Sequence, residues 1–127
     1  MYVYTLNDNL KILNQYYNIE ITDNDIDKLF KHFGLEKQKN NKVQNMSGGQ
    51  KQRLSIIRTF IQNKDIIICD EPTGNLDLYN SKIFLEELLS KKENKVIIMV
   101  SHDNSLFRFF DVVLEIKEGK LIEKNAT

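Results

Sequence analysis

The chain has 127 residues, of which 41% are hydrophobic and 28% are charged, and it contains a single proline and a single cysteine. This composition is typical of a soluble folded domain with its own core, and it excludes a disordered tail or a disulfide scaffold. Eighteen Lys and Arg residues balance eighteen Asp and Glu residues, so no overall field draws the chain onto nucleic acid or an anionic membrane.

The first predicted element is an amphipathic helix over residues 22–33. It starts at a possible N-cap, Thr22, its apolar residues recur at helical spacing, and Gly34 follows as a stop signal. The next stretch, 36–45, is polar and basic and is expected to be a surface loop.

A second helix is predicted to begin at two adjacent glycines, Gly48 and Gly49. Ser47 and Gln50 flank them with the spacing of a capping box, and apolar residues follow at helical intervals. The unpaired N–H groups at a helix N-terminus attract phosphate, and glycines let a phosphate approach the backbone. The alternative is that Ser47 only caps the helix and that the glycines relieve crowding.

The second half of the chain predicts a βαβ unit. The runs 66–69 and 96–100 are short and continuously apolar, as expected of strands buried on both faces of a sheet, and a helix over 83–89 separates them. Such strands run parallel through a crossover connection. Cys69 is expected to be a buried thiol in a reducing compartment. Apolar runs on either side of residues 117–119 predict an antiparallel hairpin at the sheet edge.

Ionisable residues follow both predicted strands. Asp70 and Glu71 come directly after the first strand, and His102 follows the second. The carboxyl ends of parallel strands are where α/β proteins bind ligands. Because side chains alternate along a strand, one carboxylate can face a metal and the other a reacting water, while His102 can donate a hydrogen bond to a phosphate. The alternatives are solvated surface carboxylates and a structural histidine.

Four motifs in this order resemble those of the ATP-binding-cassette (ABC) ATPases. MSGGQ at 46–50 is similar to their signature motif, and IIICDE at 66–71 to their Walker B strand. GNLD at 74–77 is similar to their D-loop, and SHD at 101–103 to the segment of their switch histidine. TLNDNLKIL at 5–13 is similar to the segment after their Q-loop. The resemblance implies an α/β fold: part of a P-loop NTPase core with parallel strands and crossover helices, a helical subdomain and a C-terminal β-hairpin.

The resemblance implies a role for each matching residue. Asp70 would hold Mg²⁺ through water, Glu71 would be the general base, and His102 would contact the γ-phosphate of ATP. Asp77 would reach across an interface with a second nucleotide-binding domain. At that interface the signature would contact the γ-phosphate of a nucleotide held mainly by the other subunit, and the residues involved are Ser47, Gly48, Gly49 and Gln50.

A phosphate-binding loop of the Walker A form G-x-x-x-x-G-K-[ST] does not occur in the 127 residues. That loop holds the β- and γ-phosphates with backbone N–H groups and a lysine. The family places the loop, the Q-loop glutamine and the aromatic residue that stacks on adenine upstream of Met1. The chain therefore resembles the C-terminal part of a nucleotide-binding domain, with the helical subdomain over about residues 1–63 and the second half of the catalytic core over about residues 64–127.

The implied function is that of an ATP-binding and ATP-hydrolysing subunit that powers an ABC transporter. Its expected partners are a transmembrane permease subunit, a second nucleotide-binding domain and the missing Walker A half, and no nucleic acid is expected. The sequence lacks a signal peptide and a membrane-spanning run, so the expected location is the cytoplasm, on the inner face of the membrane through the permease. Alone, the chain is expected neither to bind MgATP tightly nor to hydrolyse it.

The sequence DEPTGNLD at 70–77 is most similar to the branch that serves lipoprotein release, macrolide export and antimicrobial-peptide export. One alternative is a soluble ABC-type ATPase acting on the ribosome or DNA. The ribosome-acting branch typically has Asn-His before Leu-Asp, where this chain has Gly74-Asn75, which disfavours that function. The other alternative is a non-catalytic remnant or interaction module that contributes only the signature side of a dimer interface.

Overall fold

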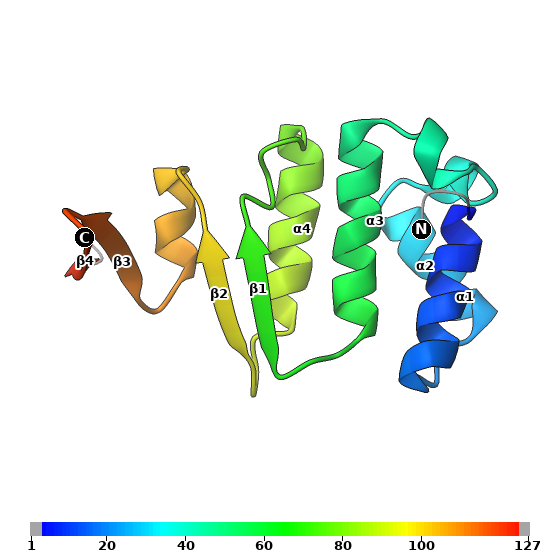
Figure 1. Ribbon diagram of the computed structural model, residues 1–127, viewed down its shortest axis with the longest axis horizontal. Coiled ribbons are helices and arrows are strands. Elements are labelled where there is room, and N and C mark those ends of the chain that lie inside the picture. Colours follow the sequence, from blue (N-terminus) through cyan, green and yellow to red (C-terminus); the bar gives the residue numbers. More distant parts are fainter. Residues whose placement is uncertain (1–3, 125–127) are drawn as a thin grey trace.

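The computed structural model describes residues 4–124 of the chain. Figure 1 shows α1, α2 and α3 at one end, the strands β1 and β2 in the middle beside α4, and the hairpin β3–β4 at the other end. The helices are α1 (Leu6–Tyr17), α2 (Asp23–His32), α3 (Gly48–Ile61) and α4 (Leu78–Ser90), and the short 3₁₀ helices are η1 (Glu36–Gln38), η2 (Val43–Asn45) and η3 (Asn104–Phe109). The strands are β1 (Ile66–Asp70), β2 (Val96–Val100), β3 (Val113–Lys117) and β4 (Lys120–Lys124).

Three helices begin with the same local device. The N-cap residues Thr5, Thr22 and Ser47 each accept a hydrogen bond from the third residue of their helix, whose side chain in turn accepts from the N-cap backbone. These capping boxes satisfy N–H groups that a helix leaves unpaired. The predicted helices that begin after Thr22 and Ser47 are confirmed. The sequence analysis did not predict α1, although its leucines follow helical spacing.

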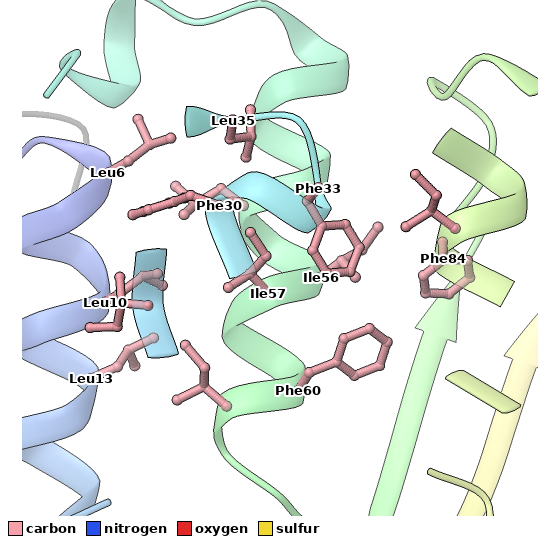
Figure 2. Packing of buried hydrophobic residues seen from close by; sticks show 14 of the residues in the cluster. Leu6, Leu10, Leu13, Phe30, Phe33, Leu35, Ile56, Ile57, Phe60 and Phe84 are labelled. Atoms are coloured by element: carbon pink, nitrogen blue, oxygen red, sulfur yellow. The ribbon is translucent and has the colours of Figure 1, made fainter. Parts of the chain in front are cut away.

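The first three helices enclose a closed apolar core. Leu6 and Leu10 of α1, Phe30 of α2 and Ile57 of α3 are all fully buried. Figure 2 shows their side chains converging between the three helices, with Leu35 above them. The rings of Phe60 and Phe84 stack with centroids 6.3 Å apart, which carries the core from α3 to α4.

The strands β1 and β2 pair in parallel, from Ile66 opposite Val96 to Asp70 opposite Val100. The predicted βαβ unit is therefore confirmed. One face of this sheet packs on the helices, where Ile67 and Cys69 are buried. Burial in this apolar environment raises the pKa of the Cys69 thiol to about 11.

The prediction that both strands are buried on both faces is wrong for this chain. β1 alternates between exposed and buried residues, and the outward side chain of Ile68 is 70% exposed. Helices cover one face only, so every second side chain of each strand lies in solvent. We call the apolar members of this set the open face; they are Ile66, Ile68, Val96, Ile98 and Val100.

One boundary and one placement differ from their predictions. α4 begins at Leu78, five residues before the predicted start, because the Asp77 side chain caps it by accepting from the Asn80 N–H at 2.8 Å. The predicted hairpin is confirmed, with Glu118 and Gly119 at positive φ in its tight turn. Within residues 4–124, however, the hairpin forms its own two-stranded sheet and is not paired with β1 or β2.

Candidate active site

The ends of β1 and β2 bring Glu71 and His102 into direct contact. The Nδ1 atom of His102 lies 2.9 Å from Oε1 of Glu71. The backbone N–H of Glu71 donates to the carbonyl of Val100 at 2.9 Å, which extends the β1–β2 pairing by one step. Two residues 31 positions apart in the chain thus form one carboxylate–imidazole pair at the carboxyl edge of the sheet.

This contact favours the protonated, positively charged form of the His102 imidazole. The hydrogen bond that His102 donates to Glu71, and then the negative charge of Glu71, raise the pKa of His102 above the ordinary 6.5, and Asp103 adds a smaller effect. A protonated imidazole carries N–H groups on both nitrogens. Nδ1–H can therefore stay on Glu71 while Nε2–H points to another acceptor, and the His102 side chain is 85% exposed. The pair can present a cationic donor to an anion.

Glu71 has an unusual backbone for a residue other than glycine. Its φ is 43°, in the left-handed region that costs energy for side chains with a Cβ. Its carbonyl accepts from the N–H of Gly74 at 3.2 Å and from Nε2 of Gln52 at 3.3 Å, and Gln52 also donates to the carbonyl of Pro72. The signature helix α3 thereby holds the loop that aims the Glu71 carboxylate.

Sequence reasoning missed this role of Gln52. The available signal was weak: Gln52 is one polar, partly buried residue about one turn into α3. Oε1 of Gln52 is buried and has no hydrogen-bond partner among the described residues. The amide is thus oriented by its donor side alone.

Asp70 ends β1 with an exposed side chain on the same side of the sheet as Ile68. Within residues 4–124 no three or more His, Cys, Asp or Glu side chains gather in a group that could hold a metal. Mg²⁺ is commonly bound by one or two carboxylates together with phosphate oxygens and waters. Asp70 fits the role of such a single carboxylate, and the other ligands would come from a nucleotide and water.

The two glycines at the start of α3, Gly48 and Gly49, have different surroundings. A Cβ on Gly49 would lie 2.9 Å from the backbone carbonyl of Asn75, whereas a Cβ on Gly48 would meet nothing within 4 Å. Ser47 Oγ accepts from the Gln50 N–H at 3.3 Å, and the Gln50 side chain accepts from the Ser47 N–H at 3.0 Å. Gly49 therefore relieves crowding, while Ser47 and Gly48 are exposed at the helix start.

Asp77 is the N-cap residue of α4 and makes no hydrogen bond to Glu71 or His102 within residues 4–124. Its carboxylate accepts from the backbone and side-chain amides of Asn80, and these bonds lower its pKa, with a smaller contribution from the positive charge of Arg53. Arg53 Nη1 donates to Asn80 Oδ1 at 2.9 Å. This network ties α3 to α4. The roles of Arg53 and Asn80 were not predicted, because they depend on a contact between residues 27 positions apart.

Residues 2–74 match the family described as "ABC transporter", and they include MSGGQ, all of β1 and the first part of the loop after it. The chain belongs to the ABC transporter family. Within residues 4–124, none of the helices has the length and apolar character needed to cross a membrane.

Relatives match the chain over most of its length. YclH of Bacillus subtilis, an "uncharacterized ABC transporter ATP-binding protein", is 44% identical over 91 residues, which are 70% of this chain and 40% of YclH. The macrolide export ATP-binding/permease protein MacB of Mannheimia succiniciproducens is 40% identical over 76% of this chain and 15% of MacB. The chain thus spans less than half the length of these curated relatives.

A solved ABC cassette has the same fold. The dimeric post-hydrolysis structure of the ATP-binding cassette MJ0796 with ADP and Pi matches all of this chain with a TM-score of 0.83 and 26% identity, and the match covers 59% of the MJ0796 chain. The ABC cassette fold, with part of a P-loop NTPase core, is therefore confirmed.

Proposed function

We propose that this chain is the ATP-binding and ATP-hydrolysing component of an ABC transporter and that it powers transport through a transmembrane permease. The observation that carries this proposal is the Glu71–His102 pair at the ends of two parallel strands. A carboxylate able to accept a proton and an imidazolium able to bind a phosphate lie together at the edge where such sheets bind ligands. The family match supports the nucleotide as ligand.

The chain's residues divide the chemistry of hydrolysis between them. Glu71 accepts a proton from the water whose oxygen attacks the γ-phosphorus, while the bond from that phosphorus to the bridging oxygen of ADP breaks. His102 donates from Nε2 to a γ-phosphate oxygen, and Asp70 is the residue that would hold Mg²⁺ when the ion is bound. Bound Mg²⁺ would neutralise charge on the phosphates. The exposed carboxylate and imidazole are accessible to such a substrate.

The start of α3 is proposed to act on a second nucleotide. Ser47 and Gly48 are exposed, so the helix N-terminus can contact the γ-phosphate of a nucleotide held by a second nucleotide-binding domain. Gln50 and Asp77 are assigned to the same interface, although their side chains are already bonded within the chain. The dimeric state of the MJ0796 cassette supports an arrangement of this kind.

In this proposal the nucleotide also needs a Walker A loop, which the 127 residues do not contain. The chain's own residues divide near position 63, after α3 and before β1, into the helical subdomain and the second half of the catalytic core. Through the permease, the assembly would lie on the inner face of the membrane.

The test is a reconstituted ATPase assay. The chain is mixed with a polypeptide that carries the Walker A half of an ABC cassette, and phosphate release from MgATP is measured. We expect hydrolysis by the mixture only, and a loss of about 10²- to 10⁴-fold for Glu71→Gln, the usual range for a general base. Glu115→Gln on β3 is the control, since Glu115 pairs with Lys124 in the hairpin. Full activity of Glu71→Gln, or micromolar ATP binding by the chain alone, would contradict the proposal.

A further inference from the structure

We propose that Gln52 is a positioning residue for Glu71: its side-chain amide, anchored on α3, holds the backbone conformation that aims the Glu71 carboxylate at the strand ends. This inference rests on the proposed function, because Glu71 is the general base proposed there. It adds a residue outside the reacting pair whose loss should slow the chemical step without weakening nucleotide binding.

Glu71 has a backbone conformation that its own sequence does not favour. Its φ is 43°, and positive φ costs energy for a residue with a Cβ. Glu71 also precedes Pro72, and contact with the proline ring pushes the preceding residue toward an extended backbone at negative φ. A conformation of this kind persists only where the surrounding structure holds it. Contacts from outside Glu71 are therefore needed to keep it.

The Gln52 side chain supplies such contacts. Its Nε2 atom donates to the carbonyl of Glu71 at 3.3 Å and also to the carbonyl of Pro72. These carbonyls belong to successive peptide units, so one amide group that binds both fixes how the two units are turned relative to each other. On the other side of its Cα, the N–H of Glu71 donates to the carbonyl of Val100 at 2.9 Å. The peptide units before and after Glu71 are thus both held, the first by β2 and the second by Gln52.

The orientation of the Gln52 amide serves this contact at a cost. Its Oε1 atom is buried and has no hydrogen-bond partner within residues 4–124, and a buried acceptor without a partner costs free energy. The reverse orientation would place Oε1 against the carbonyl oxygens of Glu71 and Pro72, which are acceptors as well. The donor side of the amide therefore decides how it lies.

The helix α3 gives Gln52 a firm base. The next residue, Arg53, donates from Nη1 to Oδ1 of Asn80 on α4 at 2.9 Å. About one turn before Gln52, a Cβ on Gly49 would lie 2.9 Å from the carbonyl of Asn75, so α3 also packs closely against the far end of the loop that follows β1. That loop is therefore placed relative to α3 at two points, and a shift of α3 would shift the general base with it.

The first experiment measures the backbone conformation of Glu71 in the full chain alone. NMR backbone chemical shifts and the three-bond coupling between the N–H and Hα protons both depend on φ. The test variant is Gln52→Met, which keeps the length of the side chain and a high helix propensity but removes the amide. The matched control is Gln62→Met, the same change at the C-cap of α3. Circular dichroism checks that both variants fold.

We expect Glu71 to lose its positive φ in Gln52→Met and to keep it in Gln62→Met. A positive φ that Gln52→Met leaves unchanged would overturn the proposal. Should Gln52→Met fail to fold, Gln52→Glu is the second variant, because it has the same shape and an ionised carboxylate cannot donate. The same loss of positive φ is expected for it, and its absence would count against the proposal in the same way.

The second experiment uses the reconstituted ATPase assay. We expect Gln52→Met to lower kcat by about 10- to 100-fold, the range for a misplaced catalytic group, and to leave the KM for MgATP unchanged. An unchanged kcat, an equal loss in Gln62→Met, or a raised KM at unchanged kcat would overturn the proposal. If the original chain does not hydrolyse ATP in the mixture, the proposed function fails, whereas loss of the positive φ in the first experiment would still support Gln52 as the residue that positions Glu71.

Discussion

The helical region, residues 5–61, and the sheet region, residues 66–124, solve the problem of burying apolar surface differently. In the helical region, Leu6, Leu10 and Phe30 are fully buried by the chain's own helices. In the sheet region, Ile68 and Ile116 are 70% and 77% exposed. The helical region thus obtains its core from local helices, whereas the sheet region leaves several large apolar side chains exposed to solvent.

The largest expected difference between the two regions comes from truncating one large apolar side chain in each. Phe30→Ala removes a ring from a closed core and should lower the free energy of unfolding by about 3 to 5 kcal/mol. Ile68→Ala removes an exposed side chain and should change it by less than about 0.5 kcal/mol. Urea unfolding followed by circular dichroism measures both. Similar losses would mean that the open face is covered in solution.

Substitutions of the two glycines test how closely α3 packs against the loop after β1. Gly49→Ala places a Cβ 2.9 Å from the Asn75 carbonyl, a backbone atom that must move, so we expect a loss of about 1 to 3 kcal/mol in unfolding free energy. Gly48→Ala has open space and should be neutral or stabilising by up to about 1 kcal/mol. The same urea titration compares them, and equal effects would contradict the close approach.

Acid should weaken the caps of the helical region. Hydrogen bonds from Thr22 lower the pKa of Asp25 below its ordinary 3.8. A lowered pKa contributes stability that is present above the unfolded value and is lost as pH falls through the folded value. Asp25→Asn should therefore make the unfolding free energy less dependent on pH between about pH 4 and pH 2. An unchanged pH dependence would show that the capping box does not hold the carboxylate in solution.

In the sheet region, the stability contributed by the Glu71–His102 pair should be lost as pH rises, whereas that of the Asp25 cap is lost as pH falls. The raised pKa of His102 means that its contribution is present below the ordinary value and is lost as pH rises through the folded value. NMR titration of the His102 ring should give a midpoint above 6.5, and Glu71→Gln should lower it. Glu118→Gln in the hairpin turn is the control. A midpoint that Glu71→Gln leaves unchanged would show that Glu71 and His102 do not interact in solution.

Local patterns predicted much of the fold. The helix starts after Thr22 and Ser47 follow from capping boxes, and the hairpin turn at Glu118 and Gly119 follows from turn chemistry. The meeting of Glu71 with His102 was predictable because parallel strands end at the same edge. Each of these features depends on residue spacing alone.

The remaining features depend on contacts that no local pattern encodes. The apolar runs at 66–69 and 96–100 predict strands covered on both faces, but coverage depends on what else packs there, and the chain supplies one layer. The bonds from Gln52 to the loop after β1 and from Arg53 to Asn80 join distant residues. The start of α4 at Leu78 was missed for a different reason, since its cap Asp77 is a local signal that bonds to Asn80 three residues on.

Cys69 is a natural labelling probe for the packing of the sheet region. It is the single thiol of the chain, it lies on the covered face of β1, and its pKa of about 11 keeps it protonated at neutral pH. Thiol reagents react with the thiolate and need access, so the buried position of Cys69 and its raised pKa should slow alkylation of the folded chain. The rate of labelling by iodoacetamide should therefore report how often this side of β1 becomes accessible, in the chain alone and with a bound partner.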